Sequence, residues 1–176
     1  MNRCQLAVAI GATWVVASYI VDVIMRPTKE AQRARQIANH SGKPMLNVGA
    51  GTSESSVRAR ILGPQLVGDI NVDLSASKDE PYGPFTVAYG DMQNLPFPDK
   101  FFGVAYSSHV LEHVDDPIRA LNEMNRVADN VVIVTPKWWA AHTWLYHNHK
   151  WYISDDQKRA YPLWNNSHKR TLMITG

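Results

Sequence analysis

The run PMLNVGAG at residues 44–51 decides the fold class of this 176-residue chain. We predict a buried strand over residues 45–48, because the run is apolar and shows no helical period. Gly49 and Gly51 then allow a sharp turn in which the backbone can approach a ligand closely. A helix is predicted over residues 55–62, and Gly63-Pro64 ends it. Strand, glycine turn and helix in this order are typical of α/β folds.

Four more predicted strands follow this first unit. They cover residues 66–74, 85–89, 101–106 and 130–135. A helix is predicted from Asp116-Pro117 to Val127, because aspartate caps free N–H groups and proline fits the first helical position. Most of the strands are apolar enough to be covered on both faces. The sequence therefore predicts an α/β fold with a Rossmann-like, doubly wound and mainly parallel sheet, preceded by one N-terminal hydrophobic helix.

Two carboxylates close neighbouring predicted strands, Asp73 the second and Asp91 the third. Ligands of doubly wound sheets bind beyond the C-terminal strand ends, where the glycine turn also lies. Asp73 stands 22 residues after Gly51, a spacing at which a strand-end acid accepts hydrogen bonds from ribose hydroxyls. Together, the glycine turn and the two acids favour a site for an adenosine-type ligand. The alternative is that these residues merely shape loops. Glu54 replaces the third glycine of a dinucleotide site, which argues against NAD.

Several segments resemble the class I S-adenosylmethionine-dependent methyltransferases, closest to the branch that includes quinone-biosynthesis C-methyltransferases. The matching segments run from Met45 to Pro136 and are MLNVGAGT, NVDL, GDMQNLPFPDKFF, SSHVLEHVDDP, ALNEMNRV and VVIVTP. The resemblance implies S-adenosyl-L-methionine as the cofactor. It fades beyond Pro136, where residues 161–164 and 171–175 are predicted to form a reduced final strand pair.

The resemblance also implies a set of cofactor-binding residues, in which the glycine turn lines the methionine part and Asp73 the ribose. The set is Asn47, Gly49, Ala50, Gly51, Asp73, Leu74, Asp91, Met92 and Ser108. Asp91 and Met92 would contact the adenine, and Ser108 would lie near the sulfonium. The family usually has an acid where Asn47 stands, a glycine where Ser53 stands and an aspartate where Gly103 stands. Asn47 can form hydrogen bonds but gives no charge to hold the cofactor's ammonium group.

Methyl transfer from a sulfonium depends mainly on holding the nucleophile against the methyl group. A base is useful when the nucleophile is a hydroxyl or phenol, and His109, at the mouth of the fourth strand, is the predicted catalytic residue. His109 could instead shape the loop through a hydrogen bond, and His113 could be a packing residue. No metal site is predicted, because a pair of His109 and His113 lacks a convincing third ligand.

The N-terminal residues 4–21 carry no charged side chain and are long enough, as a helix, to span roughly 30 Å of hydrocarbon. Basic residues follow this run, namely Arg26, Lys29, Arg33 and Arg35. The positive-inside rule then predicts a single-pass membrane protein with its C-terminal domain on the cytoplasmic side. A helix packed on a partner protein, or a signal cleaved near residues 15–17, would also fit.

We divide the chain into an anchor helix at 1–25, an amphipathic connecting helix at 26–43 and a methyltransferase-like domain at 44–176. The net charge is +2 with acids and bases intermixed, so no nucleic-acid partner is expected. The single cysteine, Cys4, excludes an internal disulfide.

Residues 138–164 are rich in tryptophan, tyrosine and histidine, and could line an acceptor site, face lipid headgroups or complete a small core. The predicted function is a membrane-anchored methyltransferase that acts on a small or lipid-like acceptor. The alternative is a non-catalytic methyltransferase-like subunit with a structural or binding role in a membrane protein complex.

Overall fold

The computed structural model describes residues 3–52, 57–154, 156, 159–163 and 171–173. Five parallel strands form its central sheet in the order β3-β2-β1-β4-β5. They are β1 (Met45–Val48), β2 (Ile70–Asp73), β3 (Ala88–Tyr89), β4 (Phe102–Ser108) and β5 (Ala128–Val134). The strand order runs outward from β1 in both directions, so β1 and β4 flank the switch point of a doubly wound sheet. The predicted Rossmann-like fold class is confirmed.

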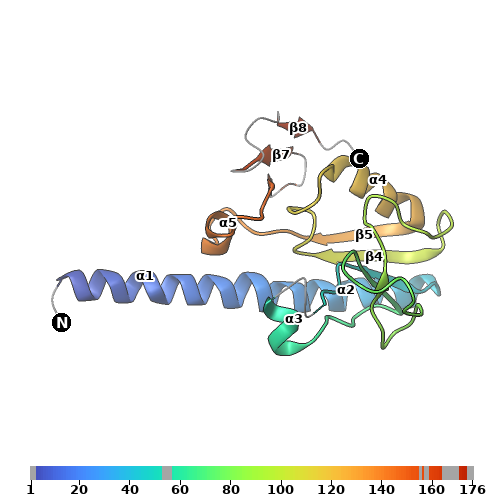
Figure 1. The fold of residues 1–176 in the computed structure, drawn as a ribbon, viewed down its shortest axis with the longest axis horizontal. Coiled ribbons are helices and arrows are strands. Elements are labelled where there is room, and N and C mark those ends of the chain that lie inside the picture. The colour runs from blue at the N-terminus through green and yellow to red at the C-terminus, as the bar shows by residue number, and fades with distance from the viewer. Residues whose placement is uncertain (1–2, 53–56, 155, 157–158, 164–170, 174–176) are drawn as a thin grey trace.

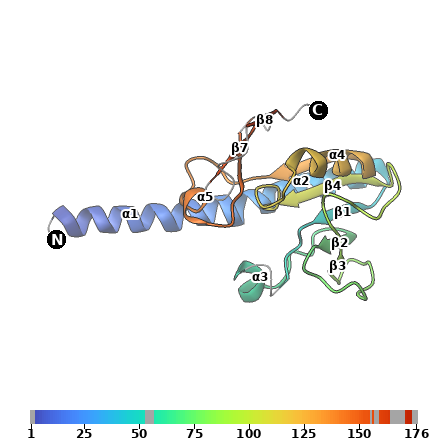
Figure 2. The same cartoon turned by 45° about the horizontal axis from the view of Figure 1, so that its top comes forward.

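Helices cover both faces of this sheet, as Figures 1 and 2 show. On one face α2 (Arg26–Ser41) buries Ala31, Ala34 and Ala38 in a cluster with Met45, Val104 and Tyr106. On the other face α4 (Pro117–Val127) buries Ala120, Met124 and Val127 against Leu46, Val48 and Phe102. The short α3 (Val57–Leu62) follows the glycine turn. The segment predicted as a connecting helix therefore supplies one of the layers that bury the sheet.

The helix α4 begins where the sequence predicts. Asp116 is its N-cap, and the carboxylate accepts hydrogen bonds from the backbone N–H groups of Ile118 and Arg119, each at 3.0 Å. Proline in the first turn has no N–H to leave unpaired. Both local signals act within a few residues, which explains why the prediction is accurate here.

The second and third strands are shorter than predicted. β2 begins at Ile70 instead of residue 66, because the Asp69 N–H donates to the Met45 carbonyl in a turn before the strand and Gly68 packs tightly against Asn47. β3 consists of Ala88–Tyr89 only, and Phe85, predicted inside it, is 87% exposed. These strands lie at the outer side of the sheet, where fewer neighbours hold the backbone extended.

A separate three-stranded antiparallel sheet follows the main sheet. It contains β6 (Trp151–Ile153), β7 (Arg159–Pro162) and β8 (Leu172–Met173) in that order. The predicted final strand pair corresponds to β7 and β8, and residues 164 and 174–175 of that prediction lie outside the described residues. β6 was not predicted. Trp151 and Ile153 pack into the α4 side of the core, so this sheet extends the cover of that face.

The N-terminal helix is longer than predicted. α1 (Arg3–Tyr19) continues through a π-helical segment (Ile20–Met25) directly into α2, although Arg26-Pro27 was expected to end it. The Arg26 N–H donates to the Val21 carbonyl, five residues earlier, and Pro27 enters the first turn of α2, where its missing N–H costs little. A widened turn therefore carries the chain past the proline.

Most of α1 extends away from the α/β body, as Figures 1 and 2 show. Residues 4–17 are all exposed, and the first contacts are made by Ser18 and Asp22, whose exposed fractions are 4% and 0%. The Ser18 hydroxyl accepts a hydrogen bond from the N–H of Ala141, the first residue of α5 (Ala141–Leu145). By length and composition, the helix from Cys4 to Ser41 could cross a membrane, a property that signal sequences and buried core helices share.

Candidate functional site

A cavity of about 560 Å³ lies at the C-terminal edge of the main sheet. The glycine turn after β1, the ends of β2 and β4 and the segments after β3 and α5 line it. Nine of the ten predicted site residues are brought together in its wall. They are Gly49, Ala50, Gly51, Asp73, Leu74, Asp91, Met92, Ser108 and His109.

Both glycines of the turn adopt a left-handed backbone, with φ of 78° at Gly49 and 79° at Gly51. A Cβ at Gly49 would lie 2.0 Å from Cγ2 of Val110, so a side chain has no room. The N–H of Gly49 donates to the Val72 carbonyl at 2.8 Å, and the N–H of Gly51 donates to the Asp73 carboxylate at 2.9 Å. Glycine at position 49 is therefore required both by the backbone of the turn and by the close packing against Val110.

Asp73 is held in place by its own loop. One carboxylate oxygen accepts hydrogen bonds from the N–H and hydroxyl of Ser75, at 3.0 and 2.6 Å, and the other accepts the Gly51 N–H. A carboxylate has about four lone-pair positions, so acceptor capacity is left for a ligand hydroxyl. This preorganised acid at the end of β2 fits the ribose of an adenosine-type cofactor.

Asn47 is the one predicted cofactor residue that does not line the cavity. Its side chain is 1% exposed, and the amide donates to the Gln65 carbonyl and to the Asn71 side chain, the latter at 3.1 Å. These bonds tie β1 to β2 and to the segment before β2. Asn47 therefore lies behind the cavity wall, where its amide supports the sheet, and the cofactor contact predicted for it is not supported by this geometry.

His109 lies at the mouth of β4, as predicted, with a left-handed φ of 56°. Its Nε2 is 3.0 Å from the Asp22 carbonyl oxygen, which can only accept, so Nε2 carries a proton. Its Nδ1 lies 3.4 Å from Oε1 of the buried Glu112. Only Nδ1 is left to take a proton, and it faces Glu112. The base role of His109 stays a prediction, and the hydrogen bond to Asp22 gives it a clear structural role.

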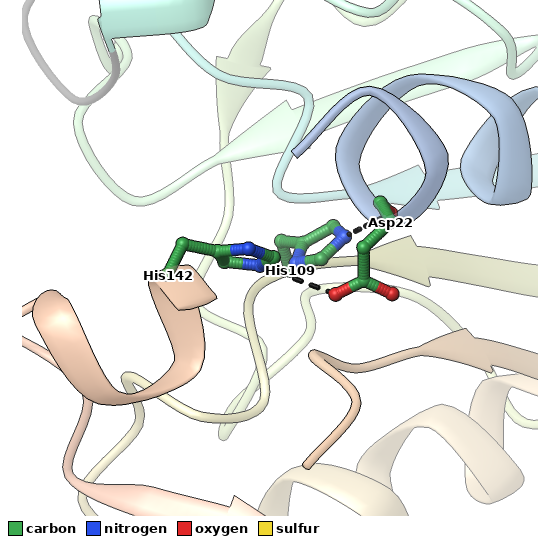
Figure 3. A group of neighbouring side chains, drawn as sticks. All are labelled: Asp22, His109 and His142. Carbon is green, nitrogen blue, oxygen red and sulfur yellow. Dashed lines mark hydrogen bonds and ion pairs between the residues drawn. The ribbon is translucent and has the colours of Figure 1, made fainter. Parts of the chain in front are cut away.

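Figure 3 shows Asp22, His109 and His142 meeting between the N-terminal helix and the body of the protein. The Asp22 carboxylate forms an ion pair with Arg26 and accepts the N–H of Lys137 at 3.2 Å. His142 on α5 places Nε2 3.2 Å from the same carboxylate. Neither Asp22 nor His142 was predicted as a site residue. The signal for Asp22 was its position as the acid within an apolar helix, where ionisable residues usually have a partner.

The pKa of His142 is lowered to about 4, chiefly by burial and then by the neighbouring charges of His109 and Arg26, while Glu112 opposes the shift. The unfolded imidazole titrates near 6.5, so between these values the unfolded state binds more protons. We expect the free energy of unfolding to be constant above about pH 6.5 and to fall as the pH drops towards 4.

Urea denaturation between pH 4 and 7, with a chelator present, measures this effect. The His142→Phe variant is the matched control, because it cannot titrate at this position. Its stability should depend less steeply on pH over the same range. Equal slopes for the two proteins would contradict the assignment.

Residues 46–131 match a family model described as a methyltransferase domain. This match spans β1 to β5 and includes the glycine turn and the strand-end acids that line the cavity. Residues 46–131 are therefore similar to methyltransferase domains. The cofactor that this match implies is S-adenosylmethionine, and the strand-end acids and the glycine turn that would hold it converge in the wall of the cavity.

One curated relative of the methyltransferase domain is a malonyl-[acyl-carrier protein] O-methyltransferase from Pectobacterium atrosepticum. It is 30% identical over 89 residues, which are 50% of this chain and 35% of the relative. The chain therefore spans about one third of the length of the relative it matches.

Two solved structures are also similar. An S-adenosylmethionine-dependent methyltransferase from Thermotoga maritima is 24% identical with a TM-score of 0.33, over 65% of this chain and 56% of that one. A complex of the Haloferax volcanii Trm112 methyltransferase activator with a methyltransferase gives 17% identity and a TM-score of 0.31, over 61% and 53%. Because both scores are low, the fold assignment rests on the strand order described above.

The Asp73 contact gives a direct test of the cofactor site. Replacing Asp73 by alanine removes the carboxylate that would accept the ribose hydroxyls, and hydrogen bonds to a charged group are worth roughly 1.5–3 kcal/mol each. We expect S-adenosylmethionine to bind at least tenfold more weakly in titration calorimetry. Asp91→Ala should have a smaller effect. Unchanged affinity in a folded Asp73→Ala protein would place the cofactor elsewhere.

Proposed function

We propose that this protein is a membrane-anchored methyltransferase that transfers the methyl group of S-adenosylmethionine to a lipid-like or small acceptor. One observation carries the proposal: the cavity that Gly49, Asp73 and Asp91 line is also lined by Tyr19 and Val23 of the N-terminal helix. The apolar helix is thus part of the wall of the site. An acceptor that arrives along this helix would reach the sheet edge directly.

The cofactor, when bound, supplies an activated methyl group on a sulfonium. The chain's own residues position the two reactants and exclude water from them. The Asp73 carboxylate is fixed by Ser75 and Gly51, and Gly49 lines the cavity beside it. Because methyl transfer gains most from holding the two reactants in contact, a shaped cavity with fixed polar groups suffices for much of the rate enhancement.

The surface of α1 supports a membrane location. Only 11% of the most apolar 18-residue window of this helix is buried within the protein. Large apolar side chains are exposed along it, namely Leu6, Val8, Ile10, Trp14, Val15 and Val16. Trp138, Trp144 and Tyr146, in and around α5, are 60%, 43% and 41% exposed, and α5 packs against α1. Aromatic rings prefer the interface between headgroups and hydrocarbon.

We place the α/β body on the cytoplasmic side, since Arg26, Lys29, Arg33 and Arg35 follow the apolar segment. In this orientation the residues around Ser18 to Met25 are at the membrane surface, and the cavity wall formed by Tyr19 and Val23 faces the headgroup layer. A membrane-bound acceptor gains in local concentration from such an arrangement, whereas a freely soluble one does not.

The test incubates the full-length protein with S-adenosylmethionine carrying a labelled methyl group and with native membranes, and then separates lipids from proteins and soluble compounds. We expect label in the lipid extract, and none from the Asp73→Ala variant. Label confined to protein or to soluble compounds would overturn the lipid-like acceptor.

A truncated variant separates anchoring from folding. Removing residues 1–25 would also remove Ser18 and Asp22, which contact the body, so the cleaner variant lacks residues 1–17. It should bind S-adenosylmethionine as the full chain does but transfer methyl groups to membrane lipids much more slowly. Full activity of this variant on dispersed membranes would show that the anchor is not needed.

A second candidate function is a non-catalytic subunit of a membrane protein complex, in which the exposed aromatic residues contact a partner. The position of Asn47 favours it, because the amide is used within the fold and no acid stands there for the cofactor's ammonium group. Calorimetric titration of the full chain with S-adenosylmethionine decides between the two. Saturable binding supports the enzyme, and its absence supports the subunit.

A further inference from the structure

A second group of polar side chains lies beside the cavity and is not explained by cofactor binding. It consists of Glu112, His113 and His149, whose ligand atoms all lie within 4.8 Å of one another. Glu112 follows β4 in the chain, and His149 comes from the segment between α5 and β6. His113 and His149 line the cavity, while Glu112 lies behind them and is 1% exposed.

The Glu112 carboxylate is a buried acid without a hydrogen-bond donor. Among the described residues neither of its oxygens has a hydrogen-bond partner, and the nearest basic atom is Nδ1 of His109 at 3.4 Å. An ionised carboxylate in this position requires a cation beside it.

Both histidines bind a backbone carbonyl through Nδ1. Nδ1 of His113 lies 3.0 Å from the Asn148 carbonyl, and Nδ1 of His149 lies 3.1 Å from the Thr143 carbonyl. A carbonyl only accepts, so in each ring Nδ1 is the donor and Nε2 keeps a lone pair in the neutral form. A histidine that donates one nitrogen to a backbone carbonyl and offers the other to an ion is the usual arrangement in metal sites.

The neighbouring group of Asp22, His109 and His142 also has ligand atoms within 4.8 Å of one another, but it differs in one respect. The Asp22 carboxylate already has a cation, Arg26, and the N–H of Lys137 as partners. A metal ion there would have to compete with the Arg26 guanidinium. Among the described residues Glu112 pairs with no arginine or lysine and meets only the His109 imidazole, so the comparison favours the Glu112 group.

We propose that Glu112, His113 and His149 bind a divalent transition-metal ion of the Zn²⁺ type at the wall of the cavity. Two imidazoles and one carboxylate are a donor set of catalytic zinc sites, in which another position stays open for water or substrate. The open position would face the cavity through His113 and His149. If the proposed function holds, an oxygen of the methyl acceptor is the natural further ligand. The metal site itself does not depend on that function.

Sequence reasoning missed this site for a simple reason. In the sequence the pair of His109 and His113 lacks a third ligand, and His149 lies far along the chain, in the segment rich in tryptophan, tyrosine and histidine. The structure supplies that ligand by returning the chain to the end of β4, where the N–H groups of Lys150 and Trp151 donate to the Glu112 carbonyl at 2.8 and 3.1 Å.

The test uses the purified full chain, stripped with a chelator and titrated with ZnCl₂ by calorimetry, and with CoCl₂ by absorption spectroscopy. We expect one ion per chain and a Co²⁺ spectrum without thiolate charge-transfer bands. Such bands would locate the ion at Cys4 and overturn the proposal. Glu112→Gln and His149→Ala should each weaken Zn²⁺ binding at least 100-fold, with folding checked by circular dichroism.

The matched control is His142→Gln, which alters the neighbouring group and should change Zn²⁺ affinity less than threefold. If Glu112→Gln or His149→Ala does not fold, His113→Ala, at a partly exposed residue, replaces it with the same expected loss. Failure of the unaltered chain to bind Zn²⁺ in a one-to-one ratio would show that a proton on a histidine neutralises Glu112. Loss of binding in His142→Gln alone would assign the ion to Asp22.

Discussion

Replacing Gly49 by alanine is expected to lower the free energy of unfolding by about 3 kcal/mol. The left-handed φ of 78° costs an alanine roughly 1–2 kcal/mol, and the new Cβ would lie 2.0 Å from Cγ2 of Val110. Overpacking of this kind typically adds roughly 1–3 kcal/mol. Urea denaturation followed by circular dichroism measures the change.

A matched control separates the two causes. Gly63 has a φ of 80°, but a Cβ there would meet no described atom within 4 Å, so Gly63→Ala should cost only the conformational term, about 1 kcal/mol. Shortening the obstructing side chain in the double variant Gly49→Ala, Val110→Ala should recover part of the loss. Equal effects at Gly49 and Gly63 would contradict the steric argument.

Local signals in the sequence predicted the elements that form the sheet and its first turn. The apolar run before Gly49, the cap at Asp116 and the strand-end acid Asp73 each act over a few residues. In the structure β1 and β2 end, and α4 begins, where these signals stand. The ends of the strand at the sheet edge were predicted less accurately, because Phe85 is an apolar residue and yet is 87% exposed. Whether a strand pairs there depends on neighbours that are distant in the chain.

The site was also predictable only in part, because local signals fix the strand ends but not the contacts between distant segments. The residues of the cavity that belong to strand ends came together as expected, since parallel strands bring their C-terminal ends to one edge. The Asn47 side chain does not line the cavity, because its amide donates hydrogen bonds to the Gln65 carbonyl and the Asn71 side chain. The pairing of Asp22 with α5, and of His149 with Glu112, arises from chain segments that no local period connects.

The second large loss of stability is expected when the contact between Asp22 and the body of the protein is removed. We expect Asp22→Ala to lower the free energy of unfolding by about 3 kcal/mol. The carboxylate is fully buried and holds Arg26 and the Lys137 N–H, and removing one partner of a buried pair leaves the other unpaired at a cost of roughly 3–5 kcal/mol. The lower end applies because the Arg26 side chain is 26% exposed and can reach water.

Denaturation of the full chain in detergent measures the effect, with Glu30→Ala as control. Glu30 pairs with Arg33 at 3.6 Å on the exposed side of α2, and the loss there should stay below about 0.5 kcal/mol. Asp22→Ala should also speed proteolysis between α1 and α2, because the same carboxylate joins the N-terminal helix to the segment before α5. If the two variants lose equal stability, the helix is held by its apolar contacts, and Tyr19 and Val23 would then keep their place in the cavity wall without Asp22.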